Sequence, residues 1–424
     1  MPDYKRKHRS RFKAAPKVNK KRVRKEEYRN DIEMTPHGEK PQKQKMRVVK
    51  GRKLEQKRNF KIFASAIGVL LVVFIICQLI IPAGIVETVS NSFAVMGAGK
   101  YPLELNSSDT LNVVSKGSYY YVLSDTEICA VSNSGKLIFS HTHGFEKPVL
   151  KTSSTRALVF DQGGTGALIF NLSGLKTTIK NEKEIINANI GENGSYALIT
   201  PADNYVSSVS VYKKNNKLVY EWLSSNDMIN SVALAPNGKK IAISTMSSNV
   251  GSYDSKVSIL NFKSANSEYT KDFKNTIIYE LDSASNSGFA VVTENSCDFI
   301  SWRGKNITEY KNDYNSDMYR SFSSGKVMVL NRESDKTDNR IVVFSKNGKL
   351  KSQIQFKGVI TDIDVKGNNI YCLSDTNVYI LDMKGQVLRT AQGGFGTQRF
   401  AVIGQNKVAV ITDNLITELK IKQE

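Results

Sequence analysis

The sequence is poor in the residues from which most catalytic and metal sites are built. It has 424 residues but only four histidines, four cysteines and two tryptophans. His8 and His37 lie near the N-terminus, so His141 and His143 are the only imidazoles in the rest of the chain. With both in one segment, we find no Ser/His/Asp or Cys/His set. Beyond residue 100 the sequence also lacks any amphipathic helical period of useful length, and short strand patterns take its place.

The four cysteines do not predict a disulfide framework. Cys77 lies in an apolar run, and the other three are odd in number and far apart on strand patterns. A framework of disulfides would be expected as an even count in a short chain. We therefore expect Cys129, Cys297 and Cys372 to be small buried hydrophobic residues.

The net charge of +20 is concentrated at one end of the chain. Residues 1–61 carry 23 Lys/Arg and 7 Asp/Glu, whereas the remaining 363 residues carry 37 and 33. The tail has few apolar residues, so we expect it to be disordered. Its basic charge favours contact with anionic lipid; a protein partner is the second interpretation, and nucleic acid is the least favoured.

Residues 62–81, "IFASAIGVLLVVFIICQLII", form an uncharged apolar run. Twenty helical residues rise about 30 Å, the thickness of the hydrocarbon core of a bilayer. A cleaved signal peptide would have a shorter apolar region behind a short basic segment, and a core helix would not be apolar throughout. We predict an uncleaved transmembrane helix over 62–82. Nine Lys/Arg in 42–61 against Lys100 alone in 82–101 predict a cytoplasmic tail and a C-terminal body outside.

The body repeats itself. Residues 119–138 read "YYYVLSDTEICAVSNSGKLI", and residues 369–388 read "NIYCLSDTNVYILDMKGQVL". Both contain Leu-Ser-Asp-Thr, and both reach a glycine at the same offset. Similar units of four short strands recur along 101–424 with a period of roughly 36–49 residues, which is typical of a β-propeller. Dipeptides such as "SG", "KG", "NG" and "RG" before the fourth strand predict hairpin turns.

We count eight such units, and seven remain an alternative because the fourth and fifth are irregular. The eighth unit, which ends in "LITELKI", lacks its outer strand. The segment "YPLELN" (101–106) is unassigned and would complete that blade, leaving no open edge. In that position Leu103 and Leu105 would point to one face and pack between neighbouring blades.

These units resemble the pyrroloquinoline-quinone-type propeller repeat, in which "ALDxxxG" leads into the fourth strand. The matching segments are "AVSNSGKLIF", "VFSKNGKLKS" and "ILDMKGQVLR". The tryptophan that usually follows the glycine is absent, and only Trp222 lies near such a position, which argues against a bound quinone. The whole layout is similar to an uncharacterised family of bacterial single-pass membrane proteins with an outer propeller, a domain of unknown function. That resemblance implies no site residues.

Four local patterns are candidate sites. His141 and His143 in "HTH" lie two apart on an outer strand, but a zinc site needs a third ligand, so we expect a solvated strand face. Asp313, Asn315 and Asp317 alternate as in a calcium loop but lack its glycine and final glutamate, and a connector into an inner strand is the simpler interpretation.

The glycine-rich segments 161–166 ("DQGGTG") and 393–397 ("GGFGT") do not join a strand to a helix, so we read them as turns. Asp362 and Asp364 either line the axial channel or belong to a hydrated inner strand. We therefore predict no catalytic, cofactor-binding or metal residues, and no cofactor.

The sequence predicts an all-β protein with four parts: a basic tail (1–61), a transmembrane helix (62–82), a linker (83–100) and an extracytoplasmic propeller (101–424). The absence of a catalytic set on a complete repeat scaffold favours a non-enzymatic interaction module for a protein or cell-envelope partner. The alternative is a ligand sensor or enzyme with its site at the mouth of the channel.

Overall fold

The computed structural model describes residues 63–65, 67–69, 83–106, 109–249, 251–264, 266–322 and 324–422. The chain forms two compact units, Met1–Val72 and Val73–Glu424. In the first, residues 63–65 and 67–69 are helical. The basic tail, Cys77 and most of the apolar run lie outside the described residues. No helix in the described part of the chain is long and apolar enough to cross a membrane.

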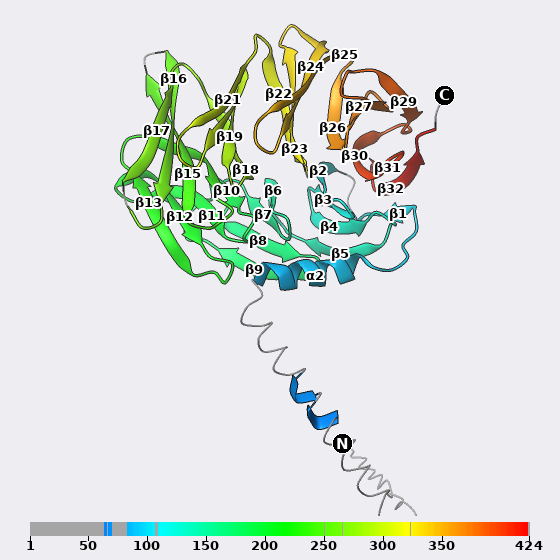
Figure 1. Ribbon diagram of the computed structural model, residues 1–424, viewed down its shortest axis with the longest axis horizontal. Coiled ribbons are helices and arrows are strands. Elements are labelled where there is room, and N and C mark those ends of the chain that lie inside the picture. Colours follow the sequence, from blue (N-terminus) through cyan, green and yellow to red (C-terminus); the bar gives the residue numbers. More distant parts are fainter. Residues whose placement is uncertain are drawn as a thin grey trace, which may run out of the picture. The chain divides into compact units, whose positions relative to one another are not determined.

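The second unit is an eight-bladed β-propeller preceded by helix α2 (Ala83–Val95) (Figure 1). Each blade is a four-stranded antiparallel sheet, which confirms the predicted fold and decides for eight blades against seven. The strands of blades 1–4 are β2 (Thr110–Ser115), β3 (Tyr119–Ser124), β4 (Glu127–Ser132) and β5 (Leu137–Thr142); β6 (Pro148–Thr152), β7 (Ala157–Asp161), β8 (Gly166–Asn171) and β9 (Gly174–Lys180); β10 (Asn187–Ile190), β11 (Tyr196–Ala202), β12 (Tyr205–Tyr212) and β13 (Leu218–Ser224); and β14 (Met228–Leu234), β15 (Lys240–Asn249), β16 (Ser252–Asn261) and β17 (Ser267–Phe273).

The strands of blades 5–8 follow in the same order, and the last blade borrows one strand from the start of the unit. They are β18 (Ile278–Ser285), β19 (Gly288–Thr293), β20 (Ser296–Ser301) and β21 (Asn306–Lys311); β22 (Asn315–Phe322), β23 (Gly325–Arg332), β24 (Asp335–Ser345) and β25 (Leu350–Lys357); β26 (Ile360–Lys366), β27 (Asn369–Ser374), β28 (Asn377–Leu381) and β29 (Val387–Gln392); and β30 (Thr397–Gly404), β31 (Lys407–Thr412), β32 (Leu415–Lys420) and β1 (Leu103–Glu104).

The core lies between blades rather than inside them. Eight apolar clusters each join residues of two neighbouring sheets, and the eighth joins blade 8 to blade 1. Middle strands are therefore covered on both faces, and every residue of β3 and β4 is buried. Full burial of a large apolar side chain contributes about 1.5–3 kcal/mol, so packing between neighbouring blades stabilises the ring.

Strand β1 closes the ring as the sequence predicts. Leu103 pairs with Ile416 and Glu104 with Leu415, antiparallel to β32. The Leu105 amide continues the contact by donating to the Asn414 carbonyl at 2.6 Å. Leu105 is buried and Leu103 half-buried, and both pack into the cluster between blades 8 and 1. The first and last strands of the propeller thus share one sheet, and no large edge is left open.

The repeated twenty residues hold the same place in two blades. They cover β3–β4 in blade 1 and β27–β28 in blade 7, and Asp125 and Asp375 lie in equivalent hairpins. The glycines at the shared offset, Gly135 and Gly385, have φ of 81° and 87° in the turn before the fourth strand. Other residues rarely adopt this conformation, which explains why the repeat keeps glycine there.

Helix α2 occupies the segment predicted as a linker and is fixed to blades 1–3 (Figure 1). The Glu87 carboxylate is buried and forms ion pairs with Arg156 (2.9 Å) and Lys214 (2.5 Å). Asn91 is buried too, and its side chain donates to the Thr155 carbonyl at 2.9 Å. At the end of the helix, the Lys136 ammonium donates to the Ala94 carbonyl at 2.9 Å, a typical interaction of a cation with a helix C-terminus.

Candidate functional site: the central channel

The inner strands of the blades surround a cavity of about 960 Å³. Residues of β2, β6, β18 and β22 form most of its wall, together with turns that follow inner strands. The wall is polar and charged because each inner strand turns alternate residues away from the apolar clusters and toward the axis. Because this cavity is lined by inner strands of several blades and by charged side chains, we treat it as the candidate site.

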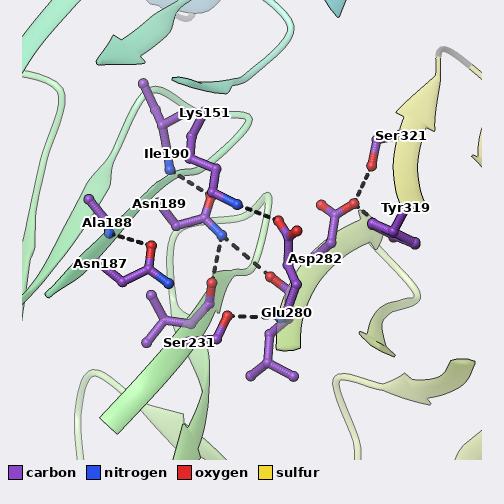
Figure 2. Close-up of polar contacts among 12 residues, drawn as sticks. Lys151, Asn187, Ala188, Asn189, Ile190, Ser231, Glu280, Asp282, Tyr319 and Ser321 are labelled. Carbon is purple, nitrogen blue, oxygen red and sulfur yellow. Dashed lines mark hydrogen bonds and ion pairs between the residues drawn. The ribbon is translucent and has the colours of Figure 1, made fainter. Parts of the chain in front are cut away.

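One ion pair crosses the channel. Lys151 on β6 of blade 2 contacts Glu280 on β18 of blade 5 at 2.6 Å, and blades 3 and 4 lie between them (Figure 2). Burial lowers the pKa of Lys151, but the charge and hydrogen bond of Glu280 outweigh it, so the pKa is raised above its usual value. The ammonium is therefore held in its charged form by a partner on a distant blade.

Asp282 gathers three donors from blade 6. Its carboxylate accepts from the Tyr319 hydroxyl at 2.9 Å and from the Ser321 hydroxyl, and it forms an ion pair with Lys326 (Figure 2 shows the Tyr319 and Ser321 contacts). Burial alone would raise the pKa of Asp282, but Lys326 and the hydroxyl donors hold it below its usual value. Burial also raises the pKa of Tyr319 well above 10.0, so the hydroxyl stays protonated and can donate. These contacts link the inner strands of blades 5 and 6.

Arg320 makes a similar link around the other side of the ring. It contacts Asp362 of blade 7 at 2.7 Å and donates to the Val113 carbonyl of blade 1 at 2.7 Å. Asp362 is fully buried and also accepts from the Phe400 amide at 3.1 Å. Burial raises the pKa of Asp362, and the Arg320 charge opposes that rise. Of the two acidic residues expected at the channel or on a hydrated inner strand, Asp364 lines the channel, whereas Asp362 is buried in the ion pair with Arg320.

A ladder of asparagines joins the inner strands of blades 3, 4 and 5. The Asn187 side chain donates to the Asn230 carbonyl at 2.8 Å, and the Asn230 side chain donates to the Ile278 carbonyl at 2.6 Å. Asn189 donates to the Val232 carbonyl at 2.6 Å, and its own oxygen accepts from the Ile190 amide at 2.7 Å (Figure 2). Sequence reasoning missed these residues, although asparagine at alternating positions of "NANI" is a visible signal of one polar strand face.

Two channel lysines remain outside these links. Neither Lys116 nor Lys346 forms an ion pair with any residue that the structure describes, and both line the channel. Burial lowers the pKa of Lys116, while Glu192, Asp282 and Asp364 act in the opposite direction. Burial raises the pKa of Asp364. The channel thus combines groups that link the blades with two lysines that lie outside those links.

Both ring nitrogens of His143 lie within hydrogen-bond distance of backbone groups. His143 is buried, its Nε2 lies 3.1 Å from the Ser124 carbonyl, and its Nδ1 accepts from the Phe145 amide at 3.0 Å. The expectation of a solvated strand face is therefore wrong for His143, which is buried and lies just beyond the end of β5 at Thr142. Within the described residues, no group of three or more His, Cys, Asp and Glu could hold a metal ion.

The residues of the calcium-like pattern span the start of β22, with Asn315 and Asp317 on the strand itself, and the glycine-rich segments lie in turns or connections. Asp313 precedes β22 and lies near Arg340 (3.8 Å), whereas Asp317 on β22 lines the channel, so the supposed calcium ligands do not converge. Residues 162–165 form the β7–β8 hairpin and residues 393–396 connect β29 to β30. The three cysteines of the propeller are free and buried, as predicted: Cys129, Cys297 and Cys372.

The fold and the site define the class of the protein: an eight-bladed β-propeller with a polar channel whose charged groups largely pair with one another. Within that class, the chain belongs to the family described as "Family of unknown function (DUF5711)", whose model matches residues 100–421. No curated protein matches the sequence.

Several solved structures are similar to this chain. The C-terminal WD40 domain of Sif2 has a TM-score of 0.52 at 10% identity, covering 77% of this chain and 100% of that one. BamB from Moraxella catarrhalis has a TM-score of 0.49 at 11% identity, covering 76% and 99%. Hydrazine synthase of Kuenenia stuttgartiensis has a TM-score of 0.41 at 12% identity, covering 78% and 100%. At these identities the likeness to the Sif2 domain indicates the fold alone.

Proposed function

We propose that this protein is a membrane-anchored, extracytoplasmic propeller that acts as a non-enzymatic scaffold for a protein or cell-envelope partner. The observation that carries the proposal is that charged groups of the channel form ion pairs between blades. Lys151, Asp282 and Arg320 are each bound to a residue of another blade, so these groups fix the ring rather than converge on one point. A catalytic centre needs acid, base or nucleophile held within reach of one reacting atom.

The proposed anchor and topology rest on the sequence, and helix α2 would connect the membrane span to the propeller. The apolar run ends at residue 81, and α2 begins at Ala83. Because Glu87 and Asn91 fix α2 to blades 1–3, a span ending at residue 81 would hold the propeller close to the membrane and in a defined orientation. The basic tail would then lie in the cytoplasm, where it would be attracted to anionic lipid.

Topology and partner are tested in intact cells. Protease added outside should digest residues 101–424 and spare residues 1–61, and a reporter fused after Glu424 should be active only outside. Photo-crosslinking from propeller residues should then capture a defined envelope component. A reporter active only in the cytoplasm would refute the topology. Turnover of an envelope substrate by purified protein, with no crosslinked partner, would refute the scaffold.

A ligand sensor is the second candidate, because Lys116 and Lys346 line a cavity of about 960 Å³ without an ion pair among the described residues. An anionic small molecule is the chemistry that such lysines would select. The melting temperature of the full chain in detergent should then rise when small carboxylates and phosphates are added. The rise should disappear in Lys116→Met but persist in Lys239→Met, which removes an exposed lysine outside the cavity. No shift with any anion would remove this candidate.

A further inference from the structure

The two faces of the ring can be told apart from its topology. Neighbouring strands in each blade are antiparallel, so the turns after the first and third strands project from one face. The turns after the second strand and the connections between blades project from the other. Helix α2 contacts Lys136, Arg156, Ser173 and Lys214, and all four lie in turns of the first kind. We call that side of the propeller the helix face and the opposite side the far face.

The two faces carry opposite charge. Between the strand bounds given above, the turns of the helix face hold 13 Lys/Arg and 2 Asp/Glu, whereas the connections of the far face hold 3 Lys/Arg and 12 Asp/Glu. Many of the basic side chains on the helix face are exposed, and they extend over blades 3–7, beyond the part that α2 covers; examples are Lys213, Lys217, Lys263, Lys349 and Lys384. None of these five forms an ion pair within the described part of the chain.

Helix α2 buries two polar side chains against the blades, packs Ala94 and Val95 on the apolar cluster of blades 1 and 2, and leaves large apolar side chains exposed. Glu87 and Asn91, one turn apart, are buried against the blades. On the opposite side, Val89 and Phe93 of the helix and Met96 just beyond its end are 49%, 66% and 62% exposed. Their spacing of four and three residues places them in one stripe. An outward apolar stripe costs free energy in water, so it indicates an apolar environment next to the helix.

We propose that the helix face lies flat on an anionic lipid bilayer, with the apolar stripe of α2 inserted at the interface and the basic turns on the headgroups. This proposal rests on the membrane anchor of the proposed function. Only residue 82 separates the end of the apolar run from Ala83, so α2 cannot start more than about 7 Å from the end of the span. A helix with an exposed apolar stripe at that position meets the headgroup region, where such helices bind.

The charge distribution selects the bilayer as the occupant. Basic residues near an anionic surface are each attracted, and the helix face offers many on one plane. The acidic far face would be repelled by the same surface and is therefore the side left for partners. On that side Phe395, in the β29–β30 connection, is fully exposed. The proposal thus assigns lipid to one face and the scaffold's partner to the other.

Amine labelling of the full chain in vesicles tests whether the helix face contacts the bilayer. Protein reconstituted in phosphatidylglycerol-containing vesicles, in phosphatidylcholine vesicles and in detergent is treated with a membrane-impermeant acylating reagent and analysed by mass spectrometry. The helix-face lysines Lys213, Lys263 and Lys349 are compared with the far-face lysines Lys147 and Lys274 of the same molecules. The far-face lysines correct for insertion in either direction, because only propellers outside the vesicle are labelled.

The expected result is at least about fivefold slower labelling of the helix-face lysines in phosphatidylglycerol vesicles, relative to the far-face lysines. An equal ratio in all three conditions would overturn the proposal. Loss of the chain from vesicles in an alkaline wash would overturn the anchor and this proposal together. Retention without protection would overturn this proposal alone. Protection by a soluble polyanion but not by vesicles would assign the face to an envelope polymer instead, which also contradicts it.

Matched variants separate insertion of α2 from general effects. Phe93→Asp places a charge in the apolar stripe and should restore labelling of Lys213 and Lys263 toward the detergent value. Phe395→Asp makes the same change at an exposed phenylalanine of the far face and should leave the labelling ratio unchanged. Both side chains are exposed, so neither variant should prevent folding. If the two variants behave alike, the stripe does not contact the bilayer.

Discussion

The attachment of helix α2 depends on one buried carboxylate, and its removal should release the helix. Glu87 is 7% exposed and its partner Arg156 is 7% exposed, while the Lys214 side chain is 27% exposed and can return to water. Removing one member of a buried ion pair costs about 3–5 kcal/mol, because the other charge stays buried without a partner. Since Lys214 can be hydrated, we expect Glu87→Ala to weaken attachment by about 3 kcal/mol, the lower end of that range.

Hydrogen exchange of the full chain in detergent measures this effect directly. A loss of about 3 kcal/mol corresponds to opening of α2 roughly 150-fold more often, so its amides should exchange faster by about that factor. Blades 5 and 6, which do not contact α2, should exchange as before. The matched control is Glu418→Ala in the exposed Lys407–Glu418 pair, where we expect less than about 1 kcal/mol.

The same carboxylate gives the attachment a pH dependence. Burial raises the pKa of Glu87, but the hydrogen bond from Lys214 and the charge of Arg156 outweigh it, so the pKa lies below its ordinary 4.5. A group whose folded pKa is lowered stabilises the folded form above its unfolded pKa, and this contribution is lost as the pH falls through the folded value. Exchange of α2 should therefore accelerate below about pH 4.5, and Glu87→Gln should lack that dependence. Unchanged exchange in Glu87→Ala would refute the reasoning.

Three further predictions concern the ring. Leu105→Ala removes a buried side chain from the cluster between blades 8 and 1 and should lower stability by about 2–5 kcal/mol in thermal melts, whereas Leu388→Ala, an exposed leucine, should change it little. Glu280→Ala leaves Lys151 without its partner across the channel, so the melting temperature should fall, and an unchanged value would show that the pair is not structural. Burial raises the pKa of the thiols of Cys129, Cys297 and Cys372, so a thiol reagent should modify these cysteines only after unfolding. Rapid labelling of the native protein would contradict their burial.

The blades could be predicted because each is a local pattern repeated eight times. Strands, hairpin glycines and even the borrowed strand at 101–106 follow from short windows of sequence. The channel links could not be predicted in this way, because Lys151 and Glu280 are far apart in sequence and meet only once the ring has formed. The sequence pattern did not predict helix α2 for another reason. Its buried side carries Glu87 and Asn91, the reverse of the apolar inward face by which helices are usually recognised.

The order of elements along the chain determines how mechanical force would pass through the molecule. Strand β1 holds the last blade through a short pairing of Leu103 and Glu104 with β32, which the Leu105 amide continues. A pull on the N-terminal side, as from an anchor in a moving membrane, would peel so short a strand from its neighbour if it arrived there directly. Helix α2 lies upstream, and the contacts of Glu87 and Asn91 transfer the pull to blades 1–3 instead. The helix would thus protect the junction between blades 8 and 1 from such a pull.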